Sequence, residues 1–195
     1  FIRELRDQRL DERDLETYTK RGTDALTRFL AAEYDSFTPA QKAELNFAGQ
    51  GVTVGDARLT GSLDLVDVND GHIFVTDYKT GRPSQNWKGS SEYEKIKLHK
   101  YRQQLMFYQL LVEGSRDYSG YRFIGGRLQF IEPEQRSGDI LALEEVFSSE
   151  DLAEFKRLIA VVWDKITTLD LPDISDYEPT YKGMIAFEHD LLDIN

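Results

Sequence analysis

The hydrophobic period of the chain changes from that of a helix to that of a strand near residue 40. Apolar residues such as Leu15, Ala25 and Phe29 recur at near-helical spacing, which predicts helices over about 1–9 and 12–33. Beyond residue 43 the spacing shifts toward two, and β-branched and aromatic residues become frequent. We place the strands of this part at 43–48, 51–55, 57–68 and 72–79.

Helices and strands alternate in the second half. Residues 80–91 form a loop by composition, and Ser91 with Glu94 has the spacing of a helix capping box. We expect a helix at 92–113, strands at 120–131 and 139–147, and a helix at 149–169 that Ser148 or Ser149 caps. The tail at 170–195 contains Pro172 and Pro179 and is expected to be mostly irregular.

This order of elements predicts one domain over 1–195 of the α/β class, more narrowly an α+β mixed sheet with helices against it. Residues 1–36 would form a helical N-terminal part and 43–169 the core. A chain of 195 residues with 40% hydrophobic and 12% aromatic residues can bury such a core. No apolar run approaches the roughly 20 residues that span a bilayer, so we expect a soluble protein without a membrane partner.

The chain contains no cysteine, which excludes disulfides, thiolate zinc sites and iron–sulfur clusters. Its three histidines, His72, His99 and His189, are too few and too scattered for a histidine-rich metal site. Any bound metal is therefore expected to be a hard cation held by oxygen atoms, such as Mg²⁺ or Mn²⁺.

Charge is distributed unevenly along the chain. The net charge of −11 argues against a general nucleic-acid binder. Residues 77–104, however, hold seven Lys or Arg and three acids, a net charge of +4 against −15 for the remainder. This basic island either contacts phosphates or is a solvated helix face. Trp87, in the same segment, is either a packing anchor or a platform on which a base stacks.

Asn69-Asp70-Gly71, between two predicted strands, is a strong signal for a hairpin turn. If Asp70 and Gly71 form a two-residue turn, Asp64 lies opposite Asp77, where Cβ atoms on one face are about 5 Å apart. Lys79, two residues beyond Asp77, shares that face. Two carboxylates at this spacing repel each other, and a divalent cation between them would remove the repulsion.

Two alternatives remain open for these residues. A slip by one residue, for example through a bulge at Gly71, sets Asp64 across from Thr76 and turns the side chains apart. Alternatively, Asp64 and Asp77 lie on an exposed side of the sheet, with Lys79 in a surface ion pair. The apolar residues that precede Asp77 in its strand count against the second alternative.

The charged residues belong to a larger pattern. Asp64 ends a G-x-x-D run, Asp77 begins D-Y-K-T-G, and Gln104 and Tyr108 form Q-x-x-x-Y in the predicted long helix. In this order the motifs resemble the PD-(D/E)XK nucleases, more narrowly their RecB-like branch. That branch occurs as the C-terminal nuclease module of UvrD/Rep-type and AddAB-type helicase–nucleases. The resemblance implies a restriction-endonuclease-like core and a metal-dependent DNA nuclease of repair or recombination.

The resemblance also implies a role for each motif residue. Asp64 and Asp77, with the backbone carbonyl of Tyr78, would ligate Mg²⁺ or Mn²⁺, and Lys79 would be the catalytic lysine. The residues expected to contact DNA are Gln104, Tyr108, Tyr101, Lys97 and Lys100, together with Arg82 in the preceding loop. Without the motifs, the tyrosines would be ordinary core residues of an amphipathic helix, with Gln104 at its boundary.

The chain departs from the RecB-like pattern at two points. Members usually carry a metal-binding histidine on a helix before the sheet, and no histidine precedes His72 here. We expect that histidine upstream of Phe1, in a longer helicase polypeptide of which this chain is a fragment. Many relatives also hold an iron–sulfur cluster through cysteines, which this chain lacks.

The expected partners are DNA, either single-stranded or at unwound ends, and the helicase motor domains of the same polypeptide. We expect a cytoplasmic, bacterial-type protein associated with the nucleoid. Two other functions remain open. One is a catalytically inactive nuclease-fold module that binds DNA or acts as a scaffold, and the other is an acidic protein-interaction domain.

Overall fold

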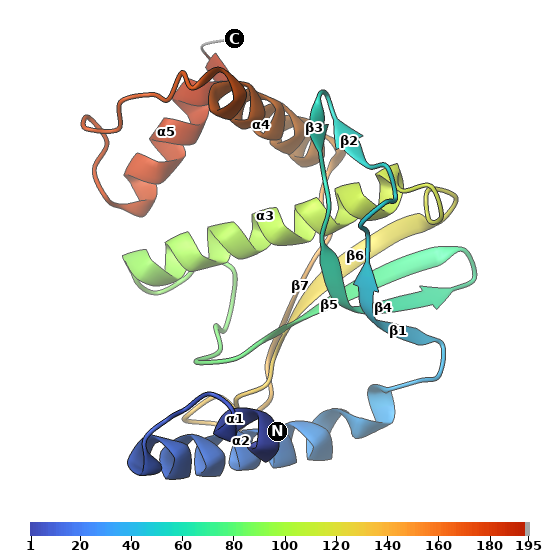
Figure 1. The fold of residues 1–195 in the computed structure, drawn as a ribbon, viewed down its shortest axis with the longest axis vertical. Coiled ribbons are helices and arrows are strands. Elements are labelled where there is room, and N and C mark those ends of the chain that lie inside the picture. The colour runs from blue at the N-terminus through green and yellow to red at the C-terminus, as the bar shows by residue number, and fades with distance from the viewer. Residues whose placement is uncertain (194–195) are drawn as a thin grey trace.

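A five-stranded mixed sheet forms the centre of the computed structural model, which describes residues 1–193 (Figure 1). Its strands lie in the order β1-β4-β5-β6-β7, and β5 and β6 are the parallel pair in an otherwise antiparallel sheet. They are β1 (Gln41–Asn46), β4 (Ser62–Asn69), β5 (His72–Lys79), β6 (Arg122–Phe130) and β7 (Ala142–Glu145). A small separate hairpin joins β2 (Thr53–Val54) to β3 (Ala57–Arg58). The predicted mixed sheet is confirmed.

Helices lie on both sides of this sheet (Figure 1). They are α1 (Ile2–Arg6), α2 (Glu12–Glu33), a short 3₁₀ turn η1 (Tyr34–Ser36), α3 (Glu92–Gly114), α4 (Ser149–Thr168) and α5 (Tyr181–Asp193). Helix α3 is the crossover between the parallel strands β5 and β6, with α4 and α5 beyond it, while α1 and α2 lie on the opposite side. Among residues 1–193, no helix has the length and apolar character needed to cross a membrane.

The β4–β5 hairpin has the two-residue turn expected from its sequence. Asp70 and Gly71 have positive φ values of 46° and 78°, as a type I′ turn requires. Asn69 pairs with His72, and the register continues to Leu65 opposite Thr76. The predicted register is therefore confirmed, and the alternative with a one-residue slip is wrong.

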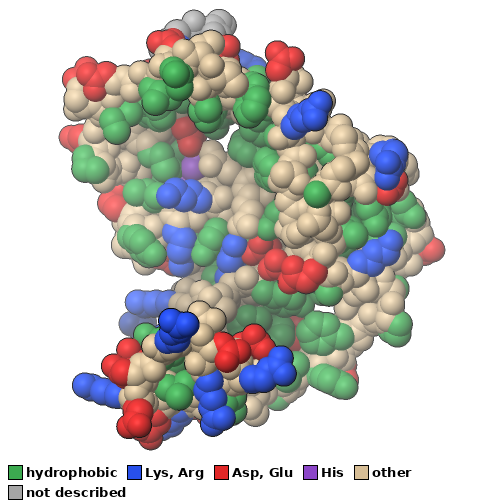
Figure 2. Space-filling model, in the orientation of Figure 1, with side chains coloured by type: hydrophobic (Ala, Val, Ile, Leu, Met, Phe, Trp, Pro, Cys, Tyr) green, Lys and Arg blue, Asp and Glu red, His purple; other side chains and the backbone are tan. Residues whose placement is uncertain are grey.

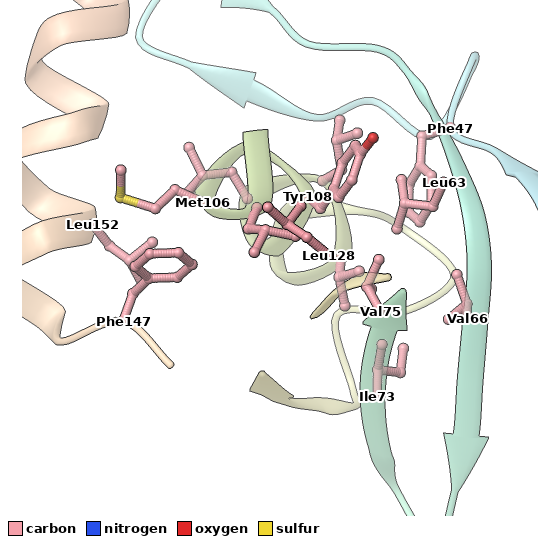
Figure 3. Close-up of a cluster of buried hydrophobic side chains, with 14 of the residues drawn as sticks. Phe47, Leu63, Val66, Ile73, Val75, Met106, Tyr108, Leu128, Phe147 and Leu152 are labelled. Atoms are coloured by element: carbon pink, nitrogen blue, oxygen red, sulfur yellow. The ribbon is translucent and has the colours of Figure 1, made fainter. Parts of the chain in front are cut away.

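The main hydrophobic core lies between the sheet and α3 (Figure 3). Leu105 and Leu111 of α3 are fully buried against the sheet. A Cβ atom added to Gly126 of β6 would lie only 3.0 Å from Leu105 Cδ2, so the glycine allows the helix to approach this closely. Figure 3 places the Tyr108 ring in the same cluster, near Leu128 and Val75. The core thus holds α3 in a fixed position against the sheet.

Two sequence expectations are wrong. The strand expected at 57–68 is divided, because β3 pairs with β2 and a new strand, β4, begins at Ser62. The tail expected to be irregular contains α5. Pro179 lies just before this helix, where a proline disrupts no helical hydrogen bond, and the Thr180 hydroxyl accepts a hydrogen bond from Gly183 N. Residues 194 and 195 of the predicted tail lie outside the described part.

The two long helices after the hairpin begin at serine caps. Ser91 accepts a hydrogen bond from Glu94 N, as predicted, but the Glu94 carboxylate binds Ser90 rather than returning to Ser91. Ser148 and Asp151 form a complete capping box at α4, so Ser148 rather than Ser149 is the cap. These caps fix where α3 and α4 begin.

Replacing Leu105 with alanine tests the packing of α3 on the sheet. Leu105 is 0% exposed, and the cavity created should lower the free energy of unfolding by about 2–5 kcal/mol. Leu171→Ala is the matched control, because Leu171 is 68% exposed and its loss should cost less than about 0.5 kcal/mol. Urea denaturation measures both. Equal effects would contradict this account of the core.

Candidate active site

Four side chains form a closed ring where β5 meets α3. Tyr108 donates a hydrogen bond to Asp77 Oδ1 over 2.6 Å, and Gln104 Nε2 donates to the Tyr108 hydroxyl over 2.6 Å. Lys79 Nζ donates to Gln104 Oε1 over 2.6 Å and lies 2.7 Å from Asp77 Oδ2. The structure therefore brings together residues that are up to 31 positions apart in the chain. We call Asp77, Lys79, Gln104 and Tyr108 the carboxylate ring.

The ring surrounds a carboxylate that water barely reaches. Asp77 is only 2% exposed, so the alternative of a surface position for it is wrong. An isolated charge at that depth would be strongly unfavourable, and the Lys79 ammonium and the Tyr108 hydroxyl compensate for it. Burial and the hydrogen bond to Asp77 both raise the pKa of Tyr108 well above its usual range. Tyr108 therefore remains a neutral donor at any physiological pH.

Asp64 lies beside the ring on β4. Its register position is one step beyond the Leu65–Thr76 pair, which sets it across from Asp77. Asp64 Oδ2 accepts a hydrogen bond from Tyr78 N over 2.9 Å. This bond ties the Asp64 carboxylate to the same stretch of β5 that carries Asp77 and Lys79.

The two carboxylates fit a hard divalent cation. Asp77 Oδ2 is buried, and within the described residues its ion pair with Lys79 Nζ at 2.7 Å is accompanied by no hydrogen bond. This oxygen therefore retains unused capacity as a ligand. Across residues 1–193 no cluster of three or more His, Cys, Asp or Glu side chains could hold a metal. Magnesium suits a site with only two carboxylate ligands, because it is commonly bound by one or two carboxylates and keeps several waters.

Comparison with known proteins agrees with this geometry. The family model described as the PD-(D/E)XK nuclease superfamily matches residues 2–177. The chain belongs to the PD-(D/E)XK nuclease superfamily. The restriction-endonuclease-like core predicted from the sequence is thereby confirmed. No curated protein matches the chain.

Two of the three histidines of this PD-(D/E)XK domain, His72 and His99, make their contacts away from the ring. His72 is exposed at the turn end of the hairpin. His99 Nε2 lies 2.9 Å from Glu188 on α5 and 3.0 Å from Gln103, so it connects α3 to α5. A further acidic residue, Glu44 of β1, lies across from Asp64 in the β1–β4 register. Its backbone has a positive φ of 51° and its side chain is exposed.

Aromatic and basic side chains continue outward from the ring. The Tyr101 ring lies 4.2 Å from Lys79 Nζ and 6.0 Å from Lys97 Nζ, measured to its centroid. Burial, reinforced by the negative charge of Asp77, raises the pKa of Tyr101. Lys100 is exposed on α3, and Arg82 is exposed in the loop after β5. Within the predicted DNA-contacting set, Lys100 and Arg82 are therefore exposed, Lys97, Tyr101 and Gln104 are half-buried, and Tyr108 is buried.

Some residues of the basic island stabilise the fold. Lys95 pairs with Glu92, and Arg102 pairs with Glu145, so these two cations serve the fold. Trp87 donates from its indole nitrogen to the Glu144 carbonyl and packs against the core, which identifies it as a packing anchor.

Glu132 is a residue of the site region that the sequence did not indicate. It follows β6, accepts a hydrogen bond from Gly81 N over 2.7 Å and pairs with Arg21 of α2. It therefore fixes the start of the loop that follows Lys79. Its distance from Gly81, 51 positions along the chain, left no local signal of this role.

A double-mutant cycle tests the ring. Tyr108→Phe leaves the buried Asp77 Oδ1 without its donor and should lower the free energy of unfolding by about 1–3 kcal/mol. Combination with Asp77→Asn should reveal a coupling energy of about 0.5–3 kcal/mol. Tyr177→Phe is the control, because its hydroxyl donates to Asp190 at the surface. Additive effects of the two ring substitutions in urea denaturation would refute the proposed coupling.

Glu94, at the start of α3, should give stability a pH dependence. Hydrogen bonds, first from the Ser90 hydroxyl, lower its pKa from 4.5 to about 2. Since the folded pKa is the lower one, the stabilisation is complete above pH 4.5 and is lost as the pH falls toward 2.

Glu94→Gln should therefore destabilise the protein at neutral pH, by no more than about 1 kcal/mol because solvent screens the site. The difference from wild type should vanish at the acid end of a pH series of urea denaturations. Glu154→Gln, at an exposed position of α4, should show no such trend. A constant difference at every pH would rule out this role of Glu94.

Proposed function

We propose that the chain is the magnesium- or manganese-dependent DNA nuclease module of a RecB-like helicase–nuclease. The observation that carries the proposal is the carboxylate ring, because it joins the D-Y-K-T-G and Q-x-x-x-Y motifs in one contact network. If the two motifs only stabilised the fold, a buried aspartate with a lysine beside it would not be required. Membership of the PD-(D/E)XK superfamily supports hydrolysis of phosphodiester bonds as the reaction.

Each residue of the site has a proposed task. Asp64 and Asp77, with the Tyr78 carbonyl, would hold the divalent cation. A cation bound there supplies an activated water and neutralises charge on the scissile phosphate. Lys79 extends a second positive charge toward the same place and stabilises the negative charge that develops on the phosphate. Gln104 fixes the Lys79 ammonium by accepting its hydrogen bond.

Tyr108 takes a different role from the DNA contact expected from the sequence. Its side chain belongs to the core, with 6% exposure, and its hydroxyl points to Asp77. We therefore propose that Tyr108 positions the metal-binding carboxylate and does not touch DNA. Gln104, which links Tyr108 to Lys79, positions the ring in the same way. Tyr101, Lys97, Lys100 and Arg82 remain the proposed DNA contacts.

The wider context follows from the branch that the motifs resemble. A RecB-like nuclease would act on single strands or unwound ends that the motor domains of its own polypeptide deliver, in repair or recombination. We place that activity in the bacterial cytoplasm, at the nucleoid. The cysteine-free sequence agrees with the members of the branch that lack an iron–sulfur cluster.

Two aspartates of one strand provide the test. Asp64→Ala should lower cleavage of single-stranded DNA by at least about 100-fold, since even changes around metal ligands cost 10–100-fold. Asp67→Ala is the matched control, because Asp67 pairs opposite Phe74 on the other face of the same strands. Cleavage of labelled DNA in magnesium or manganese measures both variants. Equal cleavage by Asp64→Ala and the wild type would refute the proposal.

A nuclease fold that binds DNA without cutting it is the second candidate. It is favoured by the small metal-binding set, since the described chain offers two acidic side chains and no histidine at the ring. Assay of the natural full-length polypeptide decides between the candidates. Turnover that Asp77→Ala abolishes supports the nuclease, and salt-sensitive DNA binding without turnover supports the second candidate.

A further inference from the structure

A cavity of about 430 Å³, lined mainly by polar and charged residues, opens at the start of α3. Its walls are the loop after β5, the first turns of α3 and the loop between β6 and β7. The side chains that matter for its chemistry are Arg82, Lys97, Arg136, Tyr93, Glu94 and Glu134. Its volume falls at the lower end of the range of small-molecule sites, about 300–1,000 Å³.

Three cations line this cavity without forming a salt bridge among the described residues, although the charges of Lys97 and Arg136 contribute, after hydrogen bonds, to lowering the pKa of Glu94 and of Glu134. Arg82, Lys97 and Arg136 form no ion pair with any residue in the described range 1–193. Several other Lys and Arg side chains of this acidic protein are paired, including Arg21 and Arg102. Figure 2 shows Lys and Arg side chains gathered around the hollow between the start of α3 and α2. Cations that line one cavity and form no salt bridge can bind an anion there.

The two carboxylates of the cavity are directed toward the backbone. Glu94 accepts hydrogen bonds from Ser90 N and Ser90 Oγ. Glu134 accepts hydrogen bonds from Arg136 N and Ser137 N. These bonds hold the carboxylates in the structure of the two loops and reduce their competition for the three cations.

Lys97 and Tyr101 connect the cavity to the ring. Lys97 lines the cavity and also lies against the Tyr101 ring, whose centroid is 4.2 Å from Lys79 Nζ. A phosphodiester strand that passes Lys79 would therefore meet Lys97 next. Tyr93 stands at the cavity with 77% of its surface exposed. An exposed tyrosine beside unpaired cations offers a face on which a base stacks.

We propose that this cavity is a subsite for one unpaired nucleotide of the substrate strand. Arg82, Lys97 and Arg136 hold the phosphate next to the scissile one, and Tyr93 stacks on the base. The inference rests on the nuclease function proposed above and specifies the substrate. A cavity of this volume takes a single nucleotide but not the width of a double helix, so the strand must be unpaired at this point.

A binding measurement under conditions that prevent cleavage tests this subsite separately from catalysis. The affinity of the wild-type protein for a labelled oligothymidine is measured by fluorescence anisotropy in EDTA, over a range of salt concentrations. Arg136→Ala should reduce the slope of log K against log salt by about 0.7, the value for one phosphate contact on a single strand. Tyr93→Ala should weaken binding at least about fivefold and leave that slope unchanged.

Two matched substitutions are the controls. Arg122→Ala removes a cation at the opposite end of β6, and Tyr34→Ala removes a tyrosine that is 70% exposed. Both should bind like the wild type. A duplex of the same length should bind less tightly than the single strand and should compete poorly for it.

Wild-type binding by both Arg136→Ala and Tyr93→Ala would overturn the subsite, and so would duplex binding that is as tight as single-strand binding. Neither result would affect the nuclease proposal, which depends on cleavage and on Asp64. Conversely, loss of single-strand binding in both variants supports the subsite even if the protein proves unable to cleave DNA.

Discussion

The Asp77 carboxylate is almost entirely removed from water, and a charge at that depth persists only among groups that compensate for it. Lys79 supplies the opposite charge and Tyr108 supplies a neutral hydrogen-bond donor. Gln104 then binds both of them, so the lysine and the tyrosine cannot move independently. The ring adds to the constraint that the core places on α3, because a shift of the helix would leave the carboxylate without its donor.

The parallel pairing of β5 and β6 explains why the site lies where it does. Parallel strands send their following loops from the same edge of a sheet, and in open α/β sheets that edge is where ligands bind. Lys79 and Phe130 pair at the ends of these two strands. The loops that carry Arg82 and Arg136 therefore emerge side by side, although 54 positions separate these residues in the chain.

Local signals made part of this structure predictable. The Asp70-Gly71 turn fixes the β4–β5 register without help from the rest of the chain, so the position of Asp64 relative to Asp77 followed from the sequence. The cap at Ser91 placed the start of α3 in the same way. Contacts between distant segments could not be predicted from the sequence. The hydrogen bond of Glu132 with Gly81, and the cavity that Arg136 lines together with Lys97, depend on how β6 and its loop return to the site.

Packing alone decides the environment of two further side chains. Tyr108 has the spacing of a residue on the functional face of α3, yet the sheet covers its ring and leaves the hydroxyl facing Asp77. Pro179 suggested an irregular tail, although it lies in the position from which a helix can start. In both cases the residue type limited the possible environments, and contacts with residues distant in the sequence determined which of them the structure adopts.

The crossover helix has a consequence for how homologous chains can vary. The loop between Lys79 and α3 can gain or lose residues between its anchors at Gly81 and Trp87 without disturbing the ring, because the cap at Ser91 and the core set where the helix lies. The interval between Gln104 and Tyr108 has no such freedom, since one inserted residue would rotate the tyrosine by about 100° around the helix axis. Length variation among relatives should therefore accumulate before α3 and stop at its second half.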